Sequence, residues 1–287
     1  NKATVGYLSP LTGLPHYSFV GGRAFSELLN LGLDALVFTG VGHTAPGRPD
    51  DYVVVSGRAP RLSVEWKPAA GLPSGQRSAF HWLLDHELGG QAEQGSVFAI
   101  GEGAHLGYRT ANLAVDGLYH AGRGGAGLAF ARYVAALVLC GQPMDWQEWF
   151  GARADAFWDL REGEFRQQLE RYTERLSRRD GGTVNKLFAT GRGPGATLPS
   201  RNAQQVGYDL ADLGASELLQ ARRAGQTGCH WCQVNCRHWH WVEVDYAPGG
   251  RDRFLDDFEP TYAIFAMLDL RPKEDSLAAR LRLLDEV

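Results

Sequence analysis

The sequence predicts an α+β protein in which a β-rich domain, residues 1–141, is followed by a mainly α-helical domain, residues 142–287. Short β-like runs and many glycines fill the first half, whereas the second half shows apolar residues at helical spacing. The 287 residues are 44% hydrophobic and 11% aromatic, which is enough to bury a substantial core. The chain opens in a strand-like run and closes inside a predicted helix that starts near residue 274. We therefore expect the first domain to be incomplete at its N-terminus and the second at its C-terminus.

The first domain contains six predicted strands and two predicted helices. The strands are expected at residues 3–8, 35–39, 52–56, 62–66, 96–100 and 134–139. The helices are expected at residues 24–31 and 76–88, where apolar residues recur at helical spacing. Residues 41–51 contain two prolines and are expected to form a surface loop.

The second domain begins with a predicted helix at residues 145–160, whose aromatic residues are expected to pack into a core. A charged helix is expected at 165–178, an irregular stretch at 181–202, and a further helix at 211–224. Residues 238–241 alternate His and Trp, a pattern typical of a strand.

Composition excludes several classes of function. The net charge of −4 argues against a nucleic-acid or anionic-membrane surface, which needs a clustered basic excess. No apolar run approaches the roughly 20 residues of a membrane-spanning helix. The cysteines are clustered, unlike those of a secreted disulfide scaffold, so a reducing compartment, the cytoplasm, is expected.

Three of the four cysteines, Cys229, Cys232 and Cys236, follow the spacing C-x2-C-x3-C. Short spacing lets neighbouring thiolates reach one metal centre, and it favours an iron–sulfur cluster here. Zinc is the alternative, because His238 and His240 follow and zinc accepts mixed cysteine and histidine ligands. Three reduced, buried cysteines without a metal are the third interpretation. The fourth cysteine, Cys140, ends an apolar run and is expected to be a core residue.

Two glycine-rich segments are typical of anion binding. Residues 120–127 gather four glycines around Arg123, and residues 9–13 are followed by Gly21 and Gly22 at a predicted helix start. Glycine lets backbone amides approach an anion, and arginine adds a charged, two-pronged donor. Neither segment matches the dinucleotide fingerprint or the P-loop, so a phosphorylated cofactor other than an ordinary nucleotide is predicted.

Taken in order, these motifs resemble the aldehyde ferredoxin oxidoreductase family over most of the chain. The matching segments are residues 9–13 (S-P-L-T-G), 21–22 (G-G), 100–101 (I-G), 116–117 (D-G), 122–127 (G-R-G-G-A-G), 229–236 and 260–262 (P-T-Y). Asp285 matches the start of a D-x-x-G-L motif that the chain end cuts short. The resemblance covers the middle of the family's chain and is weakest between residues 41 and 95.

The resemblance implies a tungsten or molybdenum bis-pterin cofactor with Mg²⁺ bridging its phosphates, together with a [4Fe–4S] cluster held by Cys229, Cys232 and Cys236. The implied cofactor-binding residues are Lys2, Phe19, Gly21, Tyr119, His120, Gly122, Arg123 and Asp285. Phe19 and His120 would contact Mg²⁺ through their backbone carbonyls. The catalytic residues and the fourth cluster ligand stay unassigned.

The implied activity is a two-electron oxidation of an aldehyde or a related small molecule, with ferredoxin or another electron-transfer protein as partner. The chain would act as a homo-oligomer or as a subunit of a complex. Tyr119 stands where the family usually has arginine, and Ala263 stands at the position of a glutamate near the metal. These departures keep open a non-catalytic or electron-transfer homologue. The zinc interpretation of the cysteine motif keeps open a third possibility, a zinc-stabilised binding module.

Overall fold

The computed structural model describes residues 2–40, 49–145, 150–174, 198–201, 204–208, 223–232, 237–243 and 248–256. Its contacts divide the chain into two compact units. The first comprises Asn1–Ala154 with Cys229–Trp231, and the second comprises Asp155–Gly228 with Cys232–Val287. A β-rich sheet domain is followed by a helical region, which confirms the predicted fold class.

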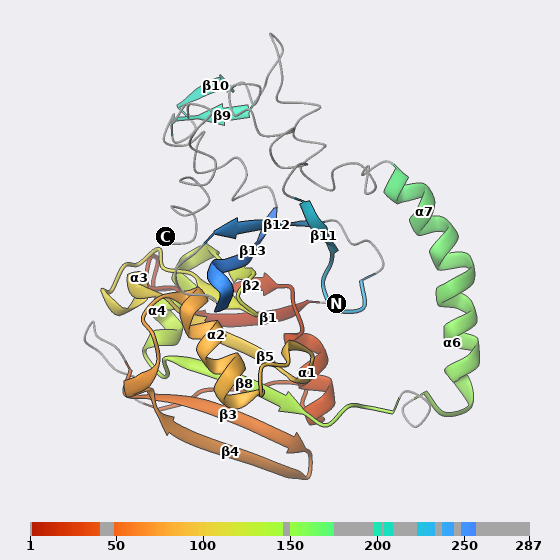
Figure 1. The fold of residues 1–287 in the computed structure, drawn as a ribbon, viewed down its shortest axis with the longest axis horizontal. Coiled ribbons are helices and arrows are strands. Elements are labelled where there is room, and N and C mark those ends of the chain that lie inside the picture. The colour runs from red at the N-terminus through yellow and green to blue at the C-terminus, as the bar shows by residue number, and fades with distance from the viewer. Residues whose placement is uncertain are drawn as a thin grey trace. The chain divides into compact units, whose positions relative to one another are not determined.

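The first unit is built on a six-stranded sheet with the order β4-β3-β8-β5-β6-β7 (Figure 1). Its strands are β3 (Asp51–Arg58), β4 (Arg61–Pro68), β5 (Ser96–Ile100), β6 (Leu113–Val115), β7 (Tyr119–Ala121) and β8 (Ala136–Gly141). Only the β3–β8 pair is parallel. The strands predicted from the apolar runs at 52–56, 62–66, 96–100 and 134–139 all lie in this sheet.

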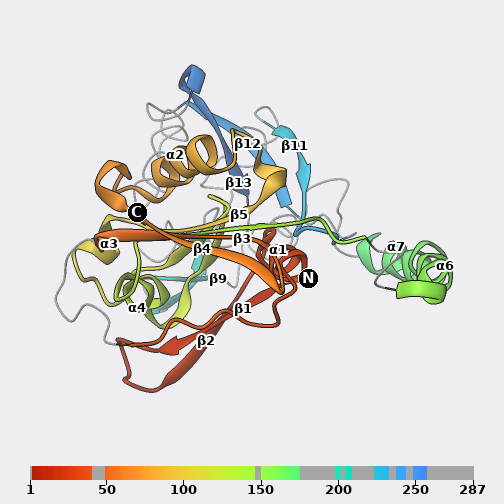
Figure 2. The same cartoon turned by 90° about the horizontal axis from the view of Figure 1, so that it is seen from below.

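Helix α2 (Gln76–Glu87) covers one face of the sheet, and α4 (Ala126–Ala131) lies on the other (Figure 2). The α2 side holds a core cluster in which Leu83 of α2 joins Val54 of β3, Val97 of β5 and Val138 of β8. Alternation along each strand sends the neighbouring residues to the opposite face. Cys140 packs against this cluster, as the sequence predicts.

Helix α1 (Ala24–Leu31) packs against β8 and matches its predicted bounds. It ends at Gly32, whose left-handed backbone (φ 71°) lets its amide bond to the carbonyls of Leu28 and Leu29. The short helix α3 (Glu102–His105) follows β5. Single 3-10 turns occur at Ala69–Gly71, Ala92–Gln94, Arg123–Gly125, Gly151–Arg153 and Pro248–Gly250.

A separate two-stranded hairpin precedes α1. Strand β1 (Ala3–Leu8) was expected, whereas its antiparallel partner β2 (Pro15–Val20) was not. The hairpin buries Ala3, Ser18 and Val20 and exposes Tyr17 and Phe19 on its other face. Residues 35–39 form no strand, which makes that prediction wrong. The backbone of this segment pairs with no strand, and the Phe38 ring instead contacts the rings of Phe130 and Tyr133.

The second unit contains helices and short sheets. Helix α6 (Ala154–Leu160) continues through a π-helical turn (Arg161–Phe165) into α7 (Arg166–Glu174), within the two predicted helices. Strands β9 (Leu198–Ser200) and β10 (Gln205–Tyr208) pair with each other. Strands β11 (Arg223–Thr227), β12 (Arg237–Glu243) and β13 (Arg251–Asp256) form a three-stranded sheet.

Strand β12 contains the His–Trp alternation of residues 238–241, so that strand is confirmed. Residues 223 and 224, the end of a predicted helix, lie in β11 instead, and residues 198–200 of a predicted irregular stretch form β9. The remainder of the predicted helix at 211–224 and the helix expected near 274 lie outside the described residues.

Candidate functional site

Side chains of the hairpin segment hydrogen-bond to the backbone of the glycine-rich segment at residues 120–127. The Tyr7 hydroxyl donates to the carbonyl of Arg123, and the Ser9 hydroxyl donates to the carbonyl of Gly124 at 2.8 Å. Gly124 and Gly125 both have left-handed backbones, and a Cβ on Gly125 would lie 2.1 Å from the Arg109 carbonyl oxygen. Only glycine fits there without distortion. The backbone of this segment is therefore fixed while the Arg123 side chain stays exposed.

Tyr119 joins the two glycine-rich segments. It lies at the start of β7 with 7% of its surface exposed, and its ring packs on the backbone of Gly21 and Gly22. A Cβ on Gly21 would lie 2.6 Å from Tyr119 Cδ1, well inside normal van der Waals contact. The glycine after β2 is thus required by the close approach of this ring.

The first cysteine of the motif reaches the same place from the far end of the sequence. The Cβ position of Gly21 is also 2.7 Å from Cys229 Sγ, so the sulfur and the Tyr119 ring both pack on this glycine. The next residue, His230, donates its backbone N–H to the Gly22 carbonyl at 3.3 Å. Its Nδ1 lies 2.6 Å from the hydroxyl of Ser26, on α1. Cys229 is therefore docked on the start of α1.

Burial, together with the positive charge of Arg23, lowers the pKa of His230 to about 4. The imidazole is consequently neutral at pH 7 and can hydrogen-bond to Ser26 without carrying a charge. This contact adds no net charge beside Cys229.

Asp116 ties together three segments around the site. One carboxylate oxygen accepts from the Arg23 backbone N–H at 2.7 Å, and the other accepts from Ser96 Oγ at 2.8 Å and the Val97 N–H at 2.9 Å. Complete burial raises the pKa of this carboxyl, while these hydrogen bonds and the charge of Arg23 oppose the rise. Asp116 acts from outside the helix as an acidic cap for the start of α1.

Arg23 immediately precedes α1 and follows Gly22 in the chain. Its guanidinium forms an ion pair with Glu27 at 3.1 Å, and the Glu27 side chain is only 1% exposed. The Nε–H of Arg23 is buried and has no hydrogen-bond partner among the described residues. The Arg23 Nε–H is therefore a buried donor that meets no acceptor among the described residues.

The other predicted site residues are spread more widely. Lys2 is exposed before β1, and the Phe19 side chain is 59% exposed. His120 is exposed on β7 with its Nδ1 3.2 Å from Asn112 Oδ1, and Gly122 is exposed beside it. These residues lie on the hairpin and on the segment that the hairpin holds.

Cys232 is half-buried and belongs to the second unit. Cys236, Ala263 and Asp285 lie outside the described residues. In the described ranges no three His, Cys, Asp or Glu side chains converge as a metal site. The three-thiolate set therefore stays a prediction.

The residues that are described fit an anionic, thiolate-bound centre. Cys229 is a free thiol lying in a cradle that a Cβ on Gly21 would fill, and Arg23 keeps a buried donor nearby. Iron–sulfur centres take cysteine thiolates and accept hydrogen bonds at sulfur. Sequence reasoning assigned no role to Arg23, Ser26 or Asp116. The only available signals were the cation directly after Gly-Gly and the Asp-Gly dipeptide.

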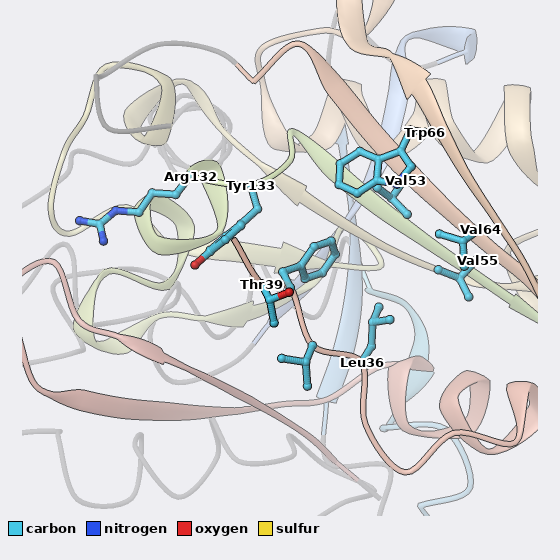
Figure 3. Close-up of a pocket in the computed structure, with 10 residues that line it drawn as sticks. Leu36, Thr39, Val53, Val55, Val64, Trp66, Arg132 and Tyr133 are labelled. Carbon is cyan, nitrogen blue, oxygen red and sulfur yellow. The ribbon is translucent and has the colours of Figure 1, made fainter. Parts of the chain in front are cut away.

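A cavity of about 340 Å³ lies elsewhere in the first unit (Figure 3). Val53 and Val55 of β3 and Trp66 of β4 line it together with residues 36–39, Arg132 and Tyr133. None of the predicted site residues lines this cavity. Across the described part of the chain, no helix is long and apolar enough to cross a membrane.

Residues 1–141 match the family model described as the N-terminal domain of aldehyde ferredoxin oxidoreductase. No curated protein matches the chain. Among solved structures the chain is similar to one described as the active site complex BamBC of benzoyl coenzyme A reductase in complex with 1,5 dienoyl-CoA. The TM-score is 0.67 at 17% identity, over 100% of this chain and 41% of that chain. This likeness shows the fold, and the chain spans less than half the length of that relative.

Proposed function

Because residues 1–141 belong to the aldehyde ferredoxin oxidoreductase N-terminal domain family, we propose that the protein is an oxidoreductase of this type. When bound, a tungsten or molybdenum bis-pterin supplies two-electron oxidation of an aldehyde or related substrate, and a [4Fe–4S] cluster supplies single-electron relay. One observation carries the proposal. Cys229, the first cysteine of the C-x2-C-x3-C motif, packs on Gly21 beside Tyr119, where both predicted pterin segments meet.

The chain's own groups suit the binding of the pterin phosphates. Backbone groups of Gly21 and Gly122, with the exposed side chains of Arg123 and Lys2, would bind these anions. Tyr7 and Ser9 orient the backbone beside Arg123, so its side chain can turn toward a phosphate without disturbing the loop. The carbonyls of Phe19 and His120 would hold Mg²⁺, an ion that prefers oxygen ligands. Asp285 would hydrogen-bond a pterin.

The cysteine motif would bind the cluster. Cys229, Cys232 and Cys236 would each provide a thiolate. The Tyr119 ring and the Cys229 sulfur pack on the same glycine, Gly21, and the ring is itself buried. The start of α1 positions Cys229 through the contacts of His230 with Gly22 and Ser26.

The proposed partners follow from this chemistry. Single electrons leaving the cluster require ferredoxin or another electron-transfer protein, and the pterin centre requires a small-molecule substrate. One solved structure with this fold is described as a complex, BamBC, and the present chain would likewise be a complex subunit or a homo-oligomer. Metal centres of this kind are suited to the reducing cytoplasm.

A second candidate is an electron-transfer homologue that keeps the cluster but has lost substrate chemistry. The position of Tyr119 favours it. Where the family usually has an arginine, this chain has a buried ring that packs on glycine and offers no cation to a cofactor. This candidate therefore expects iron and sulfide without tungsten or molybdenum.

Metal analysis of the full-length protein, purified without oxygen, tests the two candidates. The oxidoreductase requires about four irons together with tungsten or molybdenum and pterin, and a brown colour from the cluster. Iron without pterin or either metal would instead support the electron-transfer homologue. Colourless protein containing zinc would refute both and support a zinc-stabilised binding module.

A further inference from the structure

We propose that Arg23 is a positioning residue that raises the reduction potential of the metal cluster bound by Cys229. The proposal rests on the proposed function, because it requires the cluster. It concerns the residue immediately before α1, which none of the sequence motifs includes as a ligand. A fixed positive charge beside an iron–sulfur centre stabilises its reduced, more negative form.

Contacts of the two residues that precede Arg23 place it beside the cysteine motif. Gly22, its neighbour in the chain, accepts the backbone hydrogen bond from His230, which follows Cys229. Gly21, one residue earlier, contacts the sulfur of Cys229.

The hydrogen bonds of the Arg23 side chain also support a role beside the cluster. One end of its guanidinium is fixed by Glu27, whereas the buried Nε–H meets no acceptor in the described parts of the chain. Buried donors in folded proteins are almost always paired, and cluster sulfurs accept such bonds. The Nε–H is therefore available to a sulfur acceptor at the Cys229 site.

Two carboxyl groups lie next to Arg23. Glu27 is buried and also accepts from the Gly141 N–H at 3.1 Å, and Asp116 bonds to the Arg23 backbone. Removing the cation should make the surroundings of the cluster more negative, whereas neutralising Glu27 should make them less negative. The two changes should then move the cluster's potential in opposite directions.

The test is a redox titration of the full-length, cluster-loaded protein, followed by electron paramagnetic resonance. In Arg23→Gln we expect the equilibrium to move about tenfold toward the oxidised cluster, which is about 59 mV for one electron. Arg23→Lys keeps the charge and should shift the potential less, and Glu27→Gln should raise it. The matched control Arg61→Gln removes an exposed arginine of β4 and should leave the potential unchanged.

Equal potentials in Arg23→Gln and Arg61→Gln would overturn the role of Arg23. Shifts of the same sign in Arg23→Gln and Glu27→Gln would do so too, because they would indicate structural damage and not charge. If Arg23→Gln does not fold, the other two variants still test the proposal. A potential that Glu27→Gln does not raise, or that Arg23→Lys raises, would overturn the role of Arg23. Wild-type protein without a cluster would refute the proposed function, whereas a cluster with unshifted potentials refutes only the role of Arg23.

Discussion

The contact of Cys229 with Gly21 can be tested by adding one methyl group, in Gly21→Ala. The new Cβ would lie 2.6 Å from Tyr119 Cδ1 and 2.7 Å from Cys229 Sγ. Comfortable carbon contacts are about 3.5–4.0 Å, so each neighbour must retreat by roughly 1 Å. Backbone strain does not contribute, because Gly21 is not among the glycines with positive φ.

The ring and the sulfur are not equally free to move. Tyr119 is buried, whereas Cys229 is only half-buried and has more room to move. We therefore expect Cys229 to be displaced. Overpacking of this kind costs about 1–3 kcal/mol of unfolding free energy. Iron content should fall as well, because one thiolate leaves its place.

Urea unfolding and iron analysis of the purified variant measure both effects. The control is Gly6→Ala in β1, where a Cβ meets no atom within 4 Å, and it should match the wild type in both. In a Tyr119→Ala background, Gly21→Ala should lower the stability less than it does in the wild type, because the ring clash is gone. Full iron content and wild-type stability in Gly21→Ala would refute the packing argument.

Further expectations concern the metal ligands, the phosphate site and two buried groups. Cys232→Ala should lose most of the iron and visible absorption, and full retention of iron would exclude Cys232 as a ligand. Arg123→Ala should weaken pterin binding by about 1.5–3 kcal/mol without changing iron content, and unchanged pterin stoichiometry would contradict a phosphate contact. Asp116→Asn places an amide donor or a weaker acceptor among three buried donors and should cost about 1–3 kcal/mol in urea unfolding; wild-type stability would show that its hydrogen bonds are dispensable. Burial and the nearby Glu27 raise the pKa of the Cys140 thiol, so its alkylation at pH 8 should be slower than that of a free cysteine and should accelerate only at higher pH; equal rates in mass spectrometry would contradict this.

Local patterns in the sequence determined many of the elements. Helices α1 and α2 follow from apolar residues at helical spacing, and β12 follows from the alternation of His and Trp at 238–241. Such patterns record which face of an element is buried, so they can be found without knowing the partner. The motifs likewise pointed to the family whose N-terminal domain model matches residues 1–141.

The prediction failed for two segments, residues 35–39 and strand β2. Residues 35–39 form a continuous apolar run that resembles a buried strand, yet Phe38 packs against aromatic rings and pairs with no strand. Strand β2 was missed because it exposes Tyr17 and Phe19 and buries Ser18, which reverses the usual relation of polarity and burial. Both outcomes depend on what the segment meets in three dimensions.

The arrangement of the candidate site was decided by the tertiary structure alone. The sequence named Gly21, Tyr119 and Cys229 separately, but only folding brings them into contact across distant parts of the chain. The same holds for Arg23 and Asp116, whose importance lies in buried donors and acceptors contributed by other segments. Sequence patterns carry local periodicity and motif chemistry, whereas contacts between remote segments arise from packing and hydrogen-bond pairing, which no local pattern encodes.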